Sequence, residues 1–195
     1  MECRKELLPA DSCKPKPTDE SKLGFGQIFC DHMFLMDYEK GKDWHDPRIV
    51  PYGPFTLDPA AKVLHYGQEI FEGMKAYRNS ADGTVHMFRP DRNIRRFNIS
   101  CERMCMPKVD PDLFMNALEL LIDLDREWVP ESPNALYIRP TMIATQRGLG
   151  VKASTEYCFF IIIGPVGSYF KHGIKPLRLK AETTFSRRGL IPCLK

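Results

Sequence analysis

The pattern of hydrophobic and polar positions divides the chain into three parts. They are a polar N-terminal stretch, a long middle part with periodic apolar residues, and a short stretch near the C-terminus that is expected to begin a further element. The stretch 14–22 contains two prolines and no apolar period. Segments of this composition do not bury enough apolar surface to become ordered. Residues 1–22 are therefore expected to form a flexible leader, with order beginning near Leu23.

The first patterned segments favour β-structure. Residues 27–38 are mostly apolar and predict a strand, and residues 39–59 are dense in Gly, Pro and Asp and predict a loop. Two short β-runs, 74–78 and 84–88, flank a polar turn. Gly83 can supply the positive φ that such a turn needs, so this pair predicts a hairpin. Between loop and hairpin, residues 64–71 predict a short apolar helix or turn.

Helical periodicity follows the hairpin. Residues 90–104 begin with a proline, which suits a first helical turn, and Ile94, Phe97, Cys101 and Met104 share one face. Asp110 is the expected N-cap of a second helix that runs to about Trp128.

Two strands complete the pattern, over residues 135–145 and 156–164. The second is almost wholly apolar, which is typical of a central strand. The order of elements predicts an α+β domain over residues 23–167. Residues 168–175 are expected to be a connector, and residues 176–195 the start of a further element.

Composition and charge narrow the function classes. The chain has 195 residues, 43% of them hydrophobic, and 28 Lys+Arg balance 25 Asp+Glu to a net charge of +3. This excess is too small to argue for nucleic acid or an anionic membrane as partner. The apolar run 158–164 is far shorter than the ~18 residues of a membrane span.

The beginning of the chain lacks an apolar signal core and is too acidic for a typical mitochondrial transit peptide, so we expect a cytoplasmic location. Seven cysteines occur at irregular spacing, without a C-x-x-C motif and away from the five histidines. Neither a disulfide framework nor a metal site is expected.

Arginines are the first candidates for chemistry. Arg92, Arg96 and Arg103 fall within about 40° of one another on a helical wheel, opposite the apolar face. They form either a solvated basic face or a contact for phosphate or carboxylate, which the planar guanidinium matches bidentately. The spacing leaves both interpretations open.

A second candidate lies in the strand 135–145. With a period of two, Tyr137 and Arg139 point to the same side, and a charge on a half-buried strand face needs a partner or a ligand. An acid such as Glu72 or Asp31 is the structural alternative. Tyr66 and Phe71 have the spacing of core aromatics, and no nucleophile motif occurs in the chain.

Several segments resemble the signature segments of branched-chain amino acid aminotransferases, in the same order and spacing over residues 25–181. They are residues 64–77; 88–97 with Ser100, Arg103, Met106 and Pro107; 125–130; 136–141; 149–151; and 164–170.

The resemblance implies the small N-terminal domain of a fold-type-IV aminotransferase that uses pyridoxal 5'-phosphate (PLP), is usually a homodimer, and transfers the amino group of leucine, isoleucine or valine to 2-oxoglutarate. The cofactor is the electron sink and the protein positions the reactants. By the same resemblance, Arg96 is the phosphate-binding arginine and Arg139 receives the distal carboxylate of glutamate. The remaining substrate-wall residues are implied to be Phe29, Tyr66, Phe71, Tyr137 and Tyr169, with Leu149 and Val151 reaching into the partner subunit's site.

The chain departs from the family's pattern after residue 187. The family continues into a Gly-rich stretch with the Schiff-base lysine before Gly-Gly-Asn-Tyr, whereas residues 188–195 read Arg-Gly-Leu-Ile-Pro-Cys-Leu-Lys. Lys195 is not assigned as catalytic, and no other catalytic residue is. The expectation is a truncated form with only the first strand of the large domain, doubtful as an enzyme alone. The alternative is a non-catalytic interaction or dimerisation domain.

Overall fold

The structure is a computed structural model that describes residues 2–168, 175–176 and 178–181. Its strands are β1 (Arg4–Lys5), β2 (His32–Glu39), β3 (Asp43–Pro51), β4 (Glu69–Phe71), β5 (Met74–Arg78), β6 (Val85–Met87), β7 (Ala135–Ala144) and β8 (Glu156–Val166). In the described part of the chain they form one eight-stranded sheet in the order β1-β3-β2-β8-β7-β5-β6, with β4 also paired to β7. All pairs are antiparallel except the parallel β1–β3 contact.

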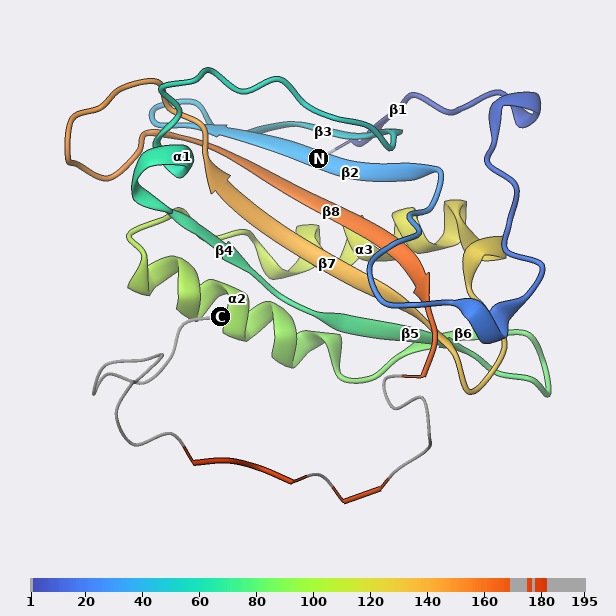
Figure 1. The fold of residues 1–195 in the computed structure, drawn as a ribbon. Coiled ribbons are helices and arrows are strands. Elements are labelled where there is room, and N and C mark those ends of the chain that lie inside the picture. The colour runs from blue at the N-terminus through green and yellow to red at the C-terminus, as the bar shows by residue number, and fades with distance from the viewer. Residues whose placement is uncertain (1, 169–174, 177, 182–195) are drawn as a thin grey trace.

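Two long helices cover one face of this sheet (Figure 1), α2 (Pro90–Arg103) and α3 (Pro111–Leu124). Short helical segments are α1 (Lys62–Tyr66), η1 (Ala10–Ser12), η2 (Glu20–Lys22) and η3 (Arg126–Trp128). The segregation of helices to one face of a mainly antiparallel sheet confirms the predicted α+β class.

The predicted helical faces are the ones that form the core. Ile94, Phe97 and Cys101 of α2 are buried together with Phe114 and Leu118 of α3. Asp110 caps α3 as predicted, because its carboxylate accepts hydrogen bonds from the backbone N–H groups of Asp112 and Leu113. The apolar pattern is therefore confirmed on both helices, and the predicted cap is confirmed on α3.

Alternation along the central strands divides the sheet into two faces. Leu136 and Ile138 of β7 and Phe159 and Ile161 of β8 belong to the core shared with the helices. Their neighbours in sequence point to the opposite face, where a smaller apolar cluster contains Ile143 and Cys158. The prediction that the apolar strand β8 is central is confirmed, since β8 lies between β2 and β7.

Strands β4 and β5 line the same edge of β7 with an unbroken register. Phe71 lies opposite Thr141 and Met74 opposite Ile138, so the intervening Gly73 falls level with Arg139. The N–H of Glu72 donates to the carbonyl of Pro140 at 2.9 Å. The predicted helix or turn at 64–71 is in fact α1 followed by β4, and the predicted hairpin is confirmed as β5–β6 with Gly83 at φ +71°.

The prediction of a loop over residues 39–59 was wrong, because β3 occupies Asp43–Pro51. Its composition is poor in strand formers, and Asp43 and Asp46 have positive φ values of 65° and 50°. Pairing with β2 overrides this local preference, since strand formation depends on the partner edge as much as on propensity. In contrast, the strand predicted from residue 27 begins only at His32.

The N-terminal segment also differs from the expected flexible leader. Residues 4–5 pair with β3, and the N–H groups of Leu8 and Lys14 donate to the side chains of His32 and Asp31. In Figure 1 this segment, in blue, runs past the end of the sheet at which β8 finishes. Long-range side-chain partners compensate for the missing apolar period.

The remaining predictions at the end of the chain cannot be compared with the structure in full. Tyr169 and Lys195 lie outside the described residues, as does most of the predicted connector. Residues 175–176 and 178–181 carry no strand, so the first strand predicted for the large domain is absent from the described part of 176–195. In the described part of the chain no helix has both the length and the apolar character to span a membrane.

Gly164 of β8 gives a test of the packing between the sheet and residues 28–29. A Cβ at this position would overlap the carbonyl oxygen of Ile28. We expect Gly164→Ala to lower the free energy of unfolding by about 1–3 kcal/mol, the usual cost of forcing an extra carbon into a packed site. Urea denaturation of the chain measures this.

Gly53→Ala is the matched control. No atom lies within 4 Å of a Cβ added at Gly53, so stability should stay constant or rise by about 0.4–1 kcal/mol. Equal losses for the two variants would contradict the packing explanation.

Candidate functional site

The open face of the sheet carries a small aromatic pocket. It measures about 180 Å³ and is lined mainly by Phe25, Phe29, Tyr137, Arg139 and Ile162. Tyr137 and Arg139 project here because both occupy the non-core positions of β7. The ring of Phe25 meets that of Tyr137 edge-on at a centroid distance of 4.8 Å.

Arg139 is held by aromatic groups and not by an acid. Its guanidinium lies 4.4 Å from the ring centroid of Phe71 and donates to the Tyr137 hydroxyl at 2.8 Å. The Nε atom is buried and has no hydrogen-bond partner within the described residues. A buried donor without a hydrogen-bond partner carries a free-energy cost.

The acids that could have paired with Arg139 have other partners. Asp31 accepts hydrogen bonds from the indole of Trp128 at 2.8 Å and from the N–H of Lys14 at 2.9 Å. Glu72 binds Arg96. Among the described residues no carboxylate forms an ion pair with Arg139, so the structure does not show the acid partner that the sequence left open, and a ligand for Arg139 stays a prediction.

Glycine at position 73 makes room for the site. A Cβ there would overlap the hydroxyl oxygen of Tyr137. The absence of a side chain lets the Tyr137 ring lie against the β4–β5 edge, with its hydroxyl in reach of Arg139. This glycine is required by a close approach, because its φ is not in the left-handed region.

Glu72, next to this glycine, organises a second group of polar residues toward α2. Its buried carboxylate accepts hydrogen bonds from Arg96 Nε at 2.5 Å and Nη2 at 2.7 Å, and from Asn93 Nδ2 at 2.9 Å. Burial raises the pKa of Glu72, but the hydrogen bonds from Arg96 and Asn93 outweigh burial and hold the pKa below its ordinary value.

Arg96 keeps part of its guanidinium free. Its side chain is 51% exposed, and Nη1 makes no hydrogen bond to any other described residue. The pKa of Arg96 is raised, chiefly by the hydrogen bond to Glu72. Of the other arginines predicted on this face, Arg92 pairs with the exposed Asp91, and Arg103 is exposed.

Tyr66, Leu149 and Val151 form a separate group at the far end of β7. The Tyr66 hydroxyl donates to the carbonyl of Leu149, and the side chains of Leu149 and Val151 are 61% and 89% exposed. The expectation that Tyr66 belongs to the core was wrong, because the ring is 44% exposed.

Lys62 fixes the loop that carries these residues. It is buried, and its ammonium donates to the carbonyls of Gly150 at 2.7 Å and Lys152 at 2.9 Å. The backbone N–H of Lys62 also donates to the carbonyl of Gln146. The loop is therefore held from below while its apolar side chains face outward.

The structure thus brings together Phe29, Phe71, Tyr137 and Arg139, places Arg96 beside them across Glu72, and sets Tyr66, Leu149 and Val151 apart. Sequence reasoning missed Phe25 and Asn93, and it named Glu72 only as a partner for Arg139. Asn93, one turn before Arg96 on α2, has the spacing from which a shared partner could have been inferred. Phe25 carried no signal, because it follows the polar leader.

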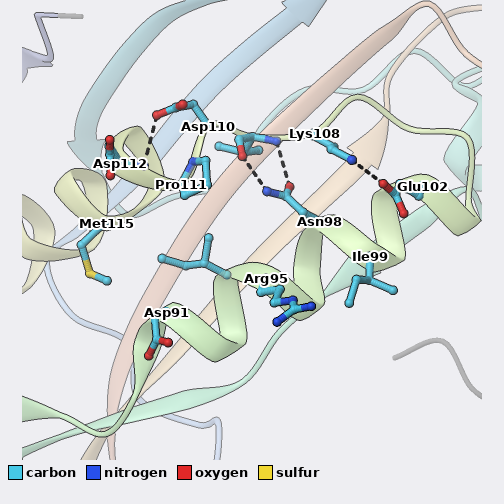
Figure 2. Close-up of a pocket in the computed structure, with 12 residues that line it drawn as sticks. Asp91, Arg95, Asn98, Ile99, Glu102, Lys108, Asp110, Pro111, Asp112 and Met115 are labelled. Carbon is cyan, nitrogen blue, oxygen red and sulfur yellow. Dashed lines mark hydrogen bonds and ion pairs between the residues drawn. The ribbon is translucent and has the colours of Figure 1, made fainter.

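A wider hollow of about 880 Å³ lies on the helical layer (Figure 2), between α2 and the segment that leads into α3. Some of its polar groups pair with one another: Asn98 exchanges two hydrogen bonds with the backbone of Val109, and Lys108 pairs with Glu102. No buried polar group points into it without a partner, so it is a junction of elements and not a candidate site. In the described residues no His, Cys, Asp and Glu side chains cluster as a metal site requires.

The mainly antiparallel sheet with two helices on one face matches the N-terminal domain of fold-type-IV aminotransferases. A branched-chain aminotransferase from Thermobaculum terrenum, solved in its PLP form, matches 73% of the chain with a TM-score of 0.56 at 22% identity, over 42% of its own length. This likeness confirms the predicted fold.

Sequence comparison then finds relatives of higher identity. The chain is 56% identical to branched-chain-amino-acid transaminase 1 of Bacillus subtilis over 176 residues, which are 89% of this chain and 49% of that protein. It is 50% identical to the aminotransferase 2 of the same organism over 175 residues, 48% of that protein. No family model matches. The chain is a homologue of the branched-chain aminotransferases, as predicted, and it spans about half the length of the curated relatives it matches.

The Glu72–Arg96 pair predicts a pH-dependent stability. The folded-state pKa of Glu72 lies below its ordinary value, so its contribution is present at neutral pH and is lost as the pH falls through the folded-state pKa. We expect Glu72→Gln to lower the free energy of unfolding by about 1.5–3 kcal/mol at pH 7, the range for hydrogen bonds to charged groups. The difference from the unsubstituted chain should shrink below about pH 4, near the reference carboxyl value.

The matched control is Glu119→Gln, at an exposed position of α3 with no hydrogen bond or ion pair in the described residues. Denaturation curves of the three proteins between pH 3 and pH 8 measure the effect. A loss for Glu72→Gln that is the same at every pH would show that the carboxylate charge plays no part.

Proposed function

We propose that this chain supplies the substrate pocket of an aminotransferase that moves the amino group of leucine, isoleucine or valine to 2-oxoglutarate. The observation that carries the proposal is Arg139, a guanidinium set among aromatic rings with a buried donor and no acid partner in the described residues. The homology to branched-chain aminotransferases supports it.

The pocket explains how one site accepts two kinds of substrate. Phe29, Phe25 and Ile162 offer an apolar wall for a branched aliphatic side chain. Arg139 lies at the same wall and can donate charge-assisted hydrogen bonds to the distal carboxylate of glutamate. While the aliphatic substrate is bound, the rings of Phe71 and Tyr137 and the Tyr137 hydroxyl keep the guanidinium partnered.

Arg96 is the residue we assign to PLP, and its geometry fits a phosphate. The bidentate pair with Glu72 fixes the plane of the guanidinium and leaves Nη1 free at a half-exposed position. A fixed donor of this kind suits a phosphate oxygen. When bound, the cofactor supplies the electron sink for transamination, and the residues of this chain bind and orient.

Tyr66, Leu149 and Val151 complete the proposal. Their separation from Arg139 and the high exposure of both aliphatic side chains support the inference that they act on the site of a second copy, in a homodimer. Tyr169 stays a prediction as a further wall residue, as does the cytoplasmic location.

The proposal is tested in a chimera that joins residues 1–181 to the unmatched remainder of Bacillus subtilis transaminase 1. Loss of a hydrogen bond to a charged group costs about 1.5–3 kcal/mol, so Arg96→Ala should weaken PLP affinity roughly 10–150-fold. Arg139→Ala should raise KM for glutamate and 2-oxoglutarate, largely spare leucine, and leave PLP occupancy unchanged. Cofactor titration and steady-state kinetics separate the two signatures.

Arg95→Ala is the control, since Arg95 is exposed next to Arg96 on the same helix and makes no hydrogen bond or ion pair to another described residue. It should change neither quantity. If the folded chimera has no transaminase activity, the chain is better described as an interaction domain. Equal losses for leucine and glutamate in Arg139→Ala would remove the substrate-discrimination role of Arg139.

A further inference from the structure

The N-terminal segment contributes a lysine to the back of the pocket. The ammonium of Lys14 donates to the carbonyls of Cys30 at 2.8 Å and Phe29 at 3.3 Å, and it lies 4.6 Å above the ring centroid of Tyr52. No carboxylate forms an ion pair with it among the described residues. The positive charge of Lys14 therefore interacts with the backbone carbonyls of residues 29–30 and with the ring of Tyr52.

Tyr52 connects this charge to the pocket wall. Its ring stacks on that of Phe29, with centroids 4.8 Å apart and planes 9° from parallel. Phe29 in turn lines the pocket that contains Tyr137 and Arg139. Lys14, Tyr52 and Phe29 thus form three successive layers, of which only the last faces the pocket.

The lysine is itself fixed in position. Its own N–H donates to the buried carboxylate of Asp31 at 2.9 Å, and the carbonyl of Asp31 accepts from the N–H of Tyr52 at 2.8 Å. Tyr52, which directly follows β3, and Lys14 of the N-terminal segment therefore both form a hydrogen bond with Asp31. The stack is held from both sides.

Gly164 gives an independent reason why the position of Phe29 needs support. The backbone at residues 28–29 crosses β8 so closely that a Cβ at Gly164 would overlap the Ile28 carbonyl. Residues 27–31 form no strand, and a backbone hydrogen bond from the N–H of Cys30 to the carbonyl of Ile163 at 2.9 Å ties this stretch to β8 at one point. The two carbonyl contacts of Lys14 act at this irregular stretch.

We propose that Lys14 is a positioning residue for the substrate pocket, setting the wall at Phe29 through the backbone carbonyls of residues 29–30 and the ring of Tyr52. The proposal rests on the proposed function for the identity of the substrate. It assigns to the N-terminal segment a role in the affinity for aliphatic side chains. Arg96 and Arg139, which are proposed to bind charged groups of the cofactor and the substrate, have no part in this role of Lys14.

The experiment has a structural and a kinetic arm, each with the same variants. Lys14→Met keeps the length of the side chain and removes its charge, and Lys14→Arg restores both donors and the cation over the ring. Lys16→Met is the control, because Lys16 belongs to the same segment but pairs with Glu127 and lies over Trp128. Tyr52→Leu removes the middle layer while leaving the carbonyl contacts of Lys14 in place.

In the structural arm, NMR on the 195-residue chain records the nuclear Overhauser contacts between the rings of Phe29 and Tyr52. We expect Lys14→Met to weaken them, Lys14→Arg to restore them and Lys16→Met to leave them unchanged. In the kinetic arm, the chimera described above should show KM for leucine raised about three- to tenfold by Lys14→Met, the loss that a cation–π contact implies, with kcat within about twofold.

The outcomes separate this proposal from the proposed function. Inactivity of every chimera counts against the proposed function, and the ring contacts then decide the role of Lys14. Unchanged ring contacts and unchanged KM in Lys14→Met overturn the proposal. If Lys14→Met does not fold, Tyr52→Leu decides: a raised KM for leucine at constant kcat supports the stack, and an unchanged KM overturns it.

Discussion

The alternation of side chains along β7 is the constraint on which the rest of the structure depends. Leu136 and Ile138 must enter the core beneath α2 and α3, so Tyr137 and Arg139 are forced onto the other face. A register slip of one residue would turn the guanidinium toward the helices and Leu136 and Ile138 away from the core. The same strand register thus determines both how β7 packs into the core and where Tyr137 and Arg139 lie.

The edge of β7 extends this coupling to the helical layer. Gly73 allows the Tyr137 hydroxyl to approach, and Glu72 sends its carboxylate to Arg96 and Asn93 on α2. Two adjacent residues therefore connect the proposed substrate pocket with the residue proposed to hold a phosphate. A buried carboxylate is tolerated here because four donors surround it, from Arg96, Asn93 and the N–H of Gly73.

Elements with strong local signals could be predicted from the sequence. Helices α2 and α3 have apolar periodicity and start signals, and β8 is a continuous apolar run, so each was found close to its true bounds. Strand β3 was missed because its stability comes from the edge of β2 and not from its own Asp- and Pro-containing sequence. For the same reason the ordered N-terminal segment was expected to be flexible: its partners, His32 and Asp31, are distant in sequence.

The candidate site, too, could be predicted from the sequence only where local signals determine it. Periodicity alone placed Tyr137 and Arg139 on one side of a strand, but it could not tell which basic residue Glu72 would bind. That choice depends on how α2 crosses the β4–β5 edge, which is a tertiary property. The resemblance to known aminotransferases supplied the proposed residue roles, and the geometry shows that Glu72 pairs with Arg96 and not with Arg139.

The clasp formed by Lys62 has a consequence for assembly. Because its ammonium holds the carbonyls of Gly150 and Lys152, the loop between them has lost most of its conformational freedom before any surface covers Leu149 and Val151. The ordering of a loop at an interface normally reduces affinity. Here the loop loses conformational entropy already during folding. A surface that covered Leu149 and Val151 would therefore bury two aliphatic side chains with little further loss of conformational entropy.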